Sequence, residues 1–405
     1  MRIAYLHQYF NTPEQSGSTR SYEFARRLAA RGHEVHVVTS DRDPDSRGSG
    51  WTHASVAGFQ VHRKAVSYSN AMNPIQRIRA FAAFALSSAR FTRQLRADVI
   101  FATSTPLTIF LPAWFASAWR KTPIVFEVRD SWPTVPIALG YLPNPTAQRL
   151  ARALERKAYR RSAHIVALSP GMAEDAVAHG ADPHSITVIP NAADVELFDV
   201  DPSRGREWRR SNGIAEDAPL IVYTGTFGAA NDVEYLVDVA EAAVKIDPRV
   251  TFALIGEGAR LSAVRERARD LGLLGGTVRI LSPVPKSDVP AVLSAADIST
   301  SVVTDNPAMN ANSANKFFDS LAAGRAIAIN HEGWQADLIR DREIGLVLDR
   351  TDVSAAAAQL LRLATDRTWR ESAHRNARLL ALEQFSRDDL AALLVETLER
   401  AAQTD

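Results

Sequence analysis

Two rounds of the same alternation constrain this chain more than any other feature of its sequence. Short apolar runs typical of strands alternate with longer helical patterns, first over residues 3–189 and again over residues 220–401. Apolar strands that alternate with helices are typical of a parallel sheet covered on both faces. Between the two rounds, Pro190–Gly213 lacks apolar periodicity and is predicted to be a linker. The sequence therefore predicts two α/β domains, each built on a doubly wound sheet.

Length and composition agree with this organisation. The chain has 405 residues, 46% of them hydrophobic, which is more than a single core usually organises. Cysteine is absent, which excludes disulfides, thiolate metal sites and cysteine nucleophiles. The start of the chain does not resemble a signal peptide. The most apolar window, Pro106–Trp119, is shorter than the ~20 residues that a spanning helix needs, so none is predicted.

Charge is distributed unevenly along the chain. Residues 1–200 carry 23 Lys and Arg against 16 Asp and Glu, whereas the remainder carries 24 against 30. Residues 60–100 hold seven basic groups and one acid, and they include a predicted basic amphipathic helix over Pro74–Arg96 with Arg77, Arg79, Arg90 and Arg93. Such a helix suits an anionic membrane surface, although a sheet-covering helix with a solvated face fits the same pattern. No nucleic-acid-binding module accompanies it, so nucleic acid is not an expected partner.

Loops that follow strands should carry the chemistry, because doubly wound sheets bind ligands at the carboxyl ends of their strands. The loop after the first strand contains Gly17 and Ser18 and leads into a helix, so it suits an anion such as a diphosphate, or makes only a plain turn. After Ile124–Val128, the ionisable Glu127, Arg129 and Asp130 form either a functional polar cluster or an Arg–carboxylate pair at the sheet edge.

The second half of the chain offers further loops of this kind. Gly225 and Gly228 lie three residues apart before a helix, and Gly256 follows another strand. The asparagine-rich loop Thr304–Asn315 leads into a helix on which Lys316 and Asp319 share one face. Lys316 and the helix start are suited to neutralise a phosphate, and Asp319 to accept hydrogen bonds from a ribose diol. A local ion pair on a solvated helix is the alternative.

Taken in order, several segments resemble the family 4 retaining GT-B glycosyltransferases, and most of all the branch that transfers N-acetyl-fucosamine-type amino sugars in bacterial O-antigen and capsule assembly. The segments that carry the resemblance are Leu28–Val35, Phe126–Pro133, Ile189–Asp194, Tyr223–Gly228 and Lys316–Gly324. They span nearly the whole chain.

The resemblance implies two Rossmann-like domains that face each other across a cleft, with the last helix crossing back to the N-terminal domain. Residues 1–192 and 385–405 would bind the acceptor, and residues 193–384 the donor. The implied activity is transfer of a hexosyl or N-acetylhexosaminyl group, with retention, from a UDP-linked sugar to a glycan or lipid-linked acceptor. The implied role is in cell-surface polysaccharide biosynthesis, without a metal or other cofactor, in the cytoplasm or on the inner face of its membrane.

The resemblance also implies residue roles. Lys316, Arg129 and Asp130 would be catalytic, and Arg20 and Trp132 would lie on the acceptor side. The expected donor-binding residues are Gly17, Ser18, Gly225, Thr226, Phe227, Gly228, Gly256, Asn310, Asn312, Ser313, Ala314, Asn315, Lys316 and Asp319.

Three positions depart from the family pattern. The usual E-x7-E motif has its second acid at Asp319 but Ala311 at its first position, so Asn310, Asn312 or backbone would contact the sugar. Ala229–Asn231 replaces the usual Arg and Lys pair, and Arg129 or Asp130 replaces the usual histidine. A nucleotide-sugar epimerase with the same fold and a non-catalytic nucleotide-sugar-binding protein are the competing interpretations.

Overall fold

The computed structural model describes residues 1–15, 17–41, 50–66, 74–192 and 194–403, except for the side chains of residues 74–81. The chain divides into two compact units. The first comprises Met1–Thr12, Gly17–Pro190 and Asp388–Asp405, and the second comprises Pro13–Ser16 and Asn191–Arg387. The junction after Pro190 lies two residues before the predicted boundary.

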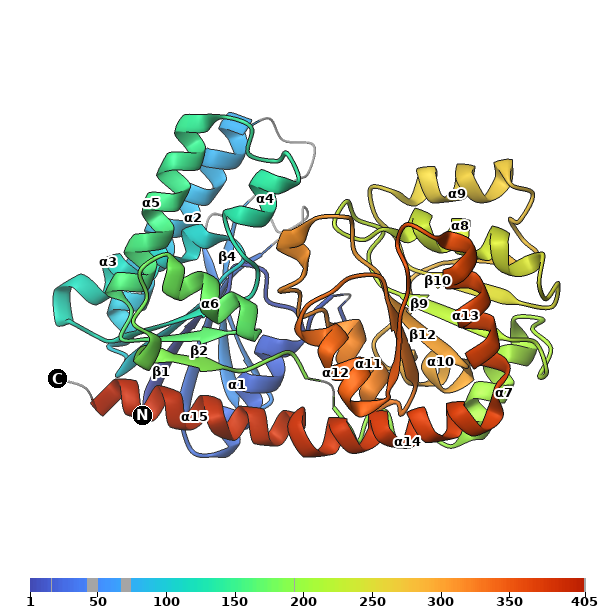
Figure 1. The fold of residues 1–405 in the computed structure, drawn as a ribbon. Helices are drawn as coiled ribbons and strands as arrows, with labels where there is room; N and C mark the ends of the chain where they lie inside the picture. The colour runs from blue at the N-terminus through green and yellow to red at the C-terminus, as the bar shows by residue number, and fades with distance from the viewer. Residues whose placement is uncertain (16, 42–49, 67–73, 193, 404–405) are drawn as a thin grey trace. The chain divides into compact units, whose positions relative to one another are not determined.

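The first unit is built on an eight-stranded sheet in the order β3-β4-β2-β1-β5-β6-β7-β8 (Figure 1). Its strands are β1 (Arg2–Leu6), β2 (Glu34–Asp41), β3 (Trp51–Val56), β4 (Phe59–Ala65), β5 (Val99–Thr103), β6 (Ile124–Val128), β7 (His164–Ala167) and β8 (Ile186–Val188). Its helices are α1 (Arg20–Ala30), α2 (Pro74–Leu95), α3 (Phe110–Arg120), α4 (Thr134–Ala138), α5 (Pro145–Arg161), α6 (Pro170–Ala178) and α15 (Arg387–Gln403), with short 3-10 turns at Leu107–Ile109 and Pro183–Ser185. Every pairing in this sheet is parallel except that of β3 with β4.

The second unit is built on a six-stranded, wholly parallel sheet in the order β11-β10-β9-β12-β13-β14. Its strands are β9 (Leu220–Thr224), β10 (Thr251–Ile255), β11 (Val278–Leu281), β12 (Ile298–Ser301), β13 (Ala326–Ile329) and β14 (Gly345–Val347). Its helices are α7 (Pro202–Ser211), α8 (Val233–Val244), α9 (Leu261–Asp270), α10 (Val289–Ala295), α11 (Asn315–Ala322), α12 (Trp334–Arg342), α13 (Val353–Thr365) and α14 (Arg367–Gln384), with a 3-10 turn at Pro307–Met309.

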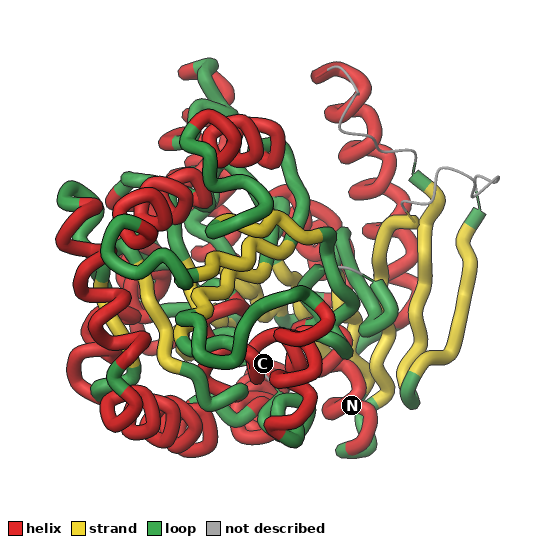
Figure 2. Tube along the Cα trace, turned by 90° about the vertical axis from the view of Figure 1, so that its right-hand side faces the viewer, coloured by secondary structure: helices red, strands yellow, loops and turns green. Residues whose placement is uncertain are grey.

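Strand alternation explains why helices cover both faces of the second sheet (Figure 2). Successive side chains of a strand point to opposite faces. Ile221 and Tyr223 of β9 therefore join one core, with α8, α9 and α13, whereas Leu220 and Val222 join the other, with α10, α11, α12 and α14. All four side chains are buried, as expected for a central strand of a parallel sheet.

The last helix belongs to the first unit, as the fold class predicts. Leu390, Leu394 and Leu398 recur every four residues on α15 and are buried. Asp388 at its start forms an ion pair with Arg27 of α1. The two-domain α/β fold with a returning C-terminal helix is confirmed.

The prediction of a linker over Pro190–Gly213 is wrong, because this segment contains α7. Gly205 lets α7 approach α10 closely, since a Cβ there would lie 2.6 Å from the backbone of Ser294. Arg209 is buried and donates to the carbonyl oxygens of Ala295 and Ala218, each at 2.8 Å. Trp208 of α7 also packs against the core, but most residues of this helix are polar and exposed, so no apolar periodicity marks it.

Candidate functional site

The order of the strands identifies the ligand-binding edge of each sheet. β1 lies between β2 and β5, and β9 lies between β10 and β12, so the order reverses beside the first strand of each unit. Doubly wound sheets bind ligands at the carboxyl ends of the strands at such a point. The loops after β1, β9 and β12 contain Gly17, Gly225 and the asparagine-rich segment, respectively. The predicted site residues therefore lie at the expected edge of their own unit.

Lys316 has an unusual set of neighbours. Its ammonium nitrogen lies 2.9 Å from Oδ1 of Asn231 and 3.2 Å from the hydroxyl of Tyr223, and 4.7 Å from the centre of the Tyr223 ring. Burial lowers the pKa of Lys316 to about 8. Its hydrogen-bond partners among the described residues are neutral. The positive charge of Lys316 is therefore not balanced by a carboxylate among the described residues and is available to an anion.

The start of α11 adds backbone donors beside Lys316. Asn191 donates from Nδ2 to the carbonyl oxygen of Ser313, at 2.5 Å, and thereby holds the segment that precedes the helix. Ala314 is the N-cap residue, and no side chain of the described chain caps the helix there. The Phe317 N–H donates to the carbonyl oxygen of Ala314, so the N–H groups of Asn315 and Lys316 are the ones suited to an anion.

Two glycines allow the loops after β9 and β10 to meet. A Cβ on Gly256 would lie 1.8 Å from the carbonyl oxygen of Gly225, and a Cβ on Gly225 would lie 2.9 Å from Cε of Lys316. Both glycines have positive φ, at +149° and +152°. The two glycines therefore allow close packing beside Lys316. A side chain at either position would push the neighbouring loop or the end of Lys316 away.

The remainder of that loop corrects one prediction. The Phe227 side chain is fully buried in the core, and its N–H and carbonyl oxygen bond to Glu257 and Arg260. Phe227 therefore positions the loop, and neither its buried side chain nor its bonded backbone groups can contact a nucleotide sugar. Thr226 is exposed and Gly228 half-buried, which leaves both accessible.

Asp319 does not pair with Lys316, so the alternative of a local ion pair is wrong. Asp319 is buried, and its carboxylate forms an ion pair with Lys286, which also lies 5.0 Å from the ring centre of Phe198. Sequence reasoning missed Lys286, although it follows β11 in a strand-end loop and the same search of strand-end loops could have found it.

The asparagine-rich loop is anchored by its backbone. The carbonyl oxygen of Asn312 accepts a hydrogen bond from the Trp334 indole at 2.8 Å. Asn310 borders a cavity of about 660 Å³, whose other lining residues include His331 and Arg350. Lys316 and Asp319 do not line this cavity, so it lies outside the predicted phosphate and ribose contacts.

In the first unit, the prediction that Arg20 lies on the acceptor side is wrong. Arg20 is 2% exposed and donates to the Glu127 carboxylate at 2.9 and 3.0 Å and to the carbonyl oxygens of Ile189 and Pro190. Glu127 is fully buried. The structure therefore supports the Arg–carboxylate alternative for Glu127, and Arg20 has no access to an acceptor.

Arg129, in contrast, remains accessible at the end of β6. Its guanidinium donates to Ser18 Oγ at 3.0 Å and lies 3.3 Å from Nε2 of His7, which follows β1. Asp130 accepts a hydrogen bond from the Thr105 hydroxyl at 2.5 Å. The structure thus gathers Arg129, Ser18 and His7 at one sheet edge. Sequence reasoning missed His7, although it too is a strand-end residue.

Gly17 and Trp132 flank this group along the chain. Gly17 has φ of +121°, and a Cβ there would lie 2.7 Å from Nδ2 of Asn11. Trp132 is half-buried and packs against the core of the first unit. The glycine is thus required for the turn, and Trp132 contributes to the packing of the first unit.

The basic helix α2 packs against α3, and the exposed surface of this pair is both basic and aromatic. Arg90 and Arg93 are exposed, and the Arg93 guanidinium lies 4.1 Å from the ring centre of Trp119. Trp119 and Phe115 of α3 are 74% and 52% exposed. The side chains of Arg77 and Arg79 lie outside the described residues. Among the described residues, no helix is long and apolar enough to cross a bilayer.

Comparisons with known proteins agree with the fold. Residues 17–192 match the glycosyl transferase 4-like domain, and residues 205–380 match the glycosyl transferases group 1. The D-inositol 3-phosphate glycosyltransferase of Corynebacterium diphtheriae is 25% identical over 92% of this chain and 88% of its own. A protein of Escherichia coli K12 whose name links it to colanic acid biosynthesis is 22% identical, over 80% of this chain and 82% of its own. The structure of Anabaena HepE in complex with UDP-glucose aligns with a TM-score of 0.75 at 17% identity, over 99% of this chain and 100% of that one.

Proposed function

Because the chain is a GT-B glycosyltransferase with a family-4-like first domain and a group 1 second domain, we propose that it takes a sugar from a UDP-linked donor. The acceptor is a glycan or a lipid-linked glycan of a cell-surface polysaccharide, and the anomeric configuration is retained. The observation that carries the proposal is the ammonium of Lys316, held by neutral oxygens beside an uncapped helix start. The UDP-glucose complex of HepE and the name of the Escherichia coli relative support the donor class and the pathway.

In this proposal Lys316 and the first N–H groups of α11 bind the donor diphosphate. Negative charge grows on the diphosphate as its bond to the sugar breaks. A cation and helix N–H groups therefore stabilise the transition state more than the bound donor. Because the charge of Lys316 is not already neutralised by a carboxylate, the whole interaction is available to the leaving group.

Asp319 binds the ribose diol in this proposal, and Lys286 positions its carboxylate. Since Ala311 has no carboxylate, Asn310 and Asn312 contact the donor sugar. Arg129 and Asp130 act on the acceptor side, as the family resemblance implies. No carboxylate is assigned as a nucleophile. The acceptor attacks the anomeric carbon from the same face from which the diphosphate leaves, which retains the configuration. Neither a metal nor another cofactor takes part.

The surface of α2 and α3 supports peripheral attachment to an anionic membrane. Exposed Arg90 and Arg93 supply positive charge, and exposed Phe115 and Trp119 supply the aromatic side chains that favour the interface. A lipid-linked acceptor would lie at the same surface. In this proposal the enzyme acts on the inner face of the membrane.

A panel of nucleotide sugars, read out by thermal shift and then by product analysis, tests the proposal. A UDP-sugar at 100 times its Kd should stabilise the chain by ~2.7 kcal/mol. Lys316→Ala should abolish that shift, whereas Lys245→Ala, which removes an exposed lysine, should not. Incubation with the same donor and a lipid-linked acceptor should then yield a glycoside with the donor's configuration. An epimerised donor would favour the epimerase, and binding without product the non-catalytic alternative.

A further inference from the structure

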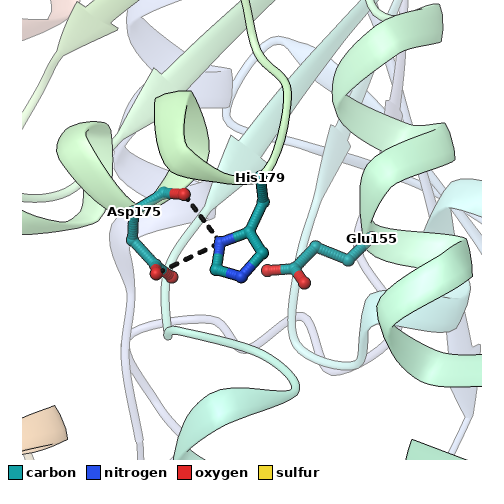
Figure 3. A group of neighbouring side chains, drawn as sticks. All are labelled: Glu155, Asp175 and His179. Atoms are coloured by element: carbon teal, nitrogen blue, oxygen red, sulfur yellow. Dashed lines mark hydrogen bonds and ion pairs between the residues drawn. The ribbon is translucent and has the colours of Figure 1, made fainter. Parts of the chain in front are cut away.

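Three potential metal ligands meet on helices α5 and α6 of the first unit, apart from the residues discussed above (Figure 3). Glu155 lies on α5, Asp175 on α6, and His179 at the end of α6. One ligand atom from each lies within 4.8 Å of the other two. Nδ1 of His179 donates to the carbonyl oxygen of Asp175 at 2.8 Å and lies 3.3 Å from its carboxylate.

Glu155 is the feature that requires an explanation. The residue is fully buried, and Oε1 accepts a hydrogen bond from the Tyr159 hydroxyl at 3.3 Å. Oε2 is buried and has no hydrogen-bond partner among the described residues. Figure 3 shows this carboxylate directed at the His179 ring. A buried carboxylate oxygen without a partner is costly, and burial accordingly raises the pKa of Glu155 to about 7.

The position of the cluster separates it from the proposed donor and acceptor chemistry. α6 follows β7 and begins at the carboxyl end of the sheet, so its last residues lie toward the opposite edge. The C-terminus of a helix carries a partial negative charge, which favours a cation there. The side chains of His179 and Asp175 are 24% and 28% exposed, which gives an ion a path to the buried Glu155.

We propose that Glu155, Asp175 and His179 bind one Zn²⁺, which ties α5 to α6. Two carboxylates and one imidazole suit zinc, whereas Mg²⁺ and Ca²⁺ prefer oxygen ligands alone. Zinc bonds of about 2.0–2.2 Å place tetrahedral ligand atoms about 3.4 Å apart, so the three ligand atoms, now within 4.8 Å of one another, approach by up to about 1.4 Å on binding. The ion gives Oε2 of Glu155 its missing partner, and water completes the coordination. The ion has a structural role and takes no part in glycosyl transfer.

Zinc binding by the full chain tests this proposal. The protein is stripped with EDTA, titrated with ZnCl₂ by calorimetry, and melted with and without zinc. We expect one Zn²⁺ per chain and a higher Tm with zinc. Glu155→Gln and His179→Gln should each weaken binding by at least about tenfold and abolish the rise in Tm. Circular dichroism of both variants checks that they fold, and Asp175→Asn is a third, independent ligand variant.

A matched control comes from the other histidine group in the same unit. His53 and His36 contact the two nitrogens of His62, at 2.7 and 2.9 Å, and could also attract zinc. His53→Gln should bind zinc like the wild type. The proposal is overturned if the wild type binds no zinc, or if the folded Glu155 and His179 variants still bind it. It is equally overturned if His53→Gln loses binding, or if MgCl₂ raises the Tm as much as zinc.

Discussion

Arg20 is a buried cation and Lys316 a half-buried one, both at the starts of helices, and their charged surroundings differ. Arg20 is the first residue of α1, which follows β1 in the first unit. Lys316 is the second residue of α11, which follows β12 in the second unit. Burial lowers the pKa of each. Arg20 is neutralised by the Glu127 carboxylate, whereas the hydrogen-bond partners of Lys316 in the described part of the chain are the neutral Asn231 and Tyr223. A buried cation whose charge is balanced within the chain holds the fold, and one without such balance is suited to an anionic substrate.

Removing the balancing carboxylate should have the largest effect. Glu127→Gln leaves the Arg20 guanidinium buried beside a neutral amide, so we expect a loss of ~3–5 kcal/mol in the free energy of unfolding of the first unit. Chemical denaturation measures this loss. Glu241→Gln removes an exposed carboxylate that pairs with Lys245 and should cost less than ~1 kcal/mol. Equal effects of the two substitutions would show that the burial of Arg20 is not decisive.

Lys316→Ala should affect catalysis instead of folding. Loss of the ammonium should lower kcat as well as donor affinity, by about 2–4 kcal/mol in kcat/KM. Burial lowers the pKa of Lys316, so the folded state binds fewer protons at this residue than the unfolded state does. The free energy of unfolding of the wild type therefore falls as the pH drops from 10.5 toward about 8. At pH 8 and below, Lys316→Ala should be no less stable than the wild type. Steady-state kinetics and melting temperatures measure both effects, with Lys245→Ala as the control. Wild-type turnover by a folded variant would place the donor elsewhere.

The pH profile should sharpen the contrast. Only the ammonium form of Lys316 binds the diphosphate, and burial lowers its pKa to about 8. Donor kcat/KM should therefore fall about tenfold per pH unit above that value. Lys316→Arg carries its charge to higher pH, so its profile should stay flat over this range, even if the rate is lower. A wild-type profile that is flat up to pH 10 would contradict this role.

Asp319 should have a smaller effect, because the ribose lies far from the reacting carbon. Asp319→Asn should raise the donor KM by a factor that corresponds to about 1–2 kcal/mol of lost binding free energy, with little change in kcat. Asp319→Glu restores the family's usual acid and should be tolerated. Since Lys286 pairs with Asp319, Lys286→Met should produce a similar rise in KM. A loss of kcat alone in Asp319→Asn would argue against ribose binding.

Exposed cations complete the comparison and should contribute least individually. Arg90→Gln and Arg93→Gln should each weaken binding to anionic liposomes by about 1 kcal/mol, with a larger difference at low salt. Co-sedimentation measures this, and Arg367→Gln, an exposed arginine of α14 in the second unit, is the control. Equal sedimentation of all three proteins would leave α2 as a sheet-covering helix only.

The sequence predicted much of the fold and part of the site. Alternating apolar runs located the strands of both sheets except β3, in which no residue is fully buried, so that no apolar pattern marks it. The polar α7 was missed for the same reason. Arg129, Gly225 and Lys316 stay predicted site residues, whereas Arg20 and Phe227, which the family resemblance also implied, are buried by the fold.

What the sequence determined by itself is therefore the periodic part: two doubly wound α/β domains, and loops at the strand ends that carry polar residues and glycines. Which charges balance one another was decided only by the tertiary structure. Arg20 and Glu127 are 107 positions apart and Lys286 and Asp319 are 33 apart, whereas Lys316 lies 85 positions from its neutral partner Asn231. No local periodicity encodes such pairs. Burial makes them decisive, because a charge removed from water must be neutralised within the chain or by a ligand.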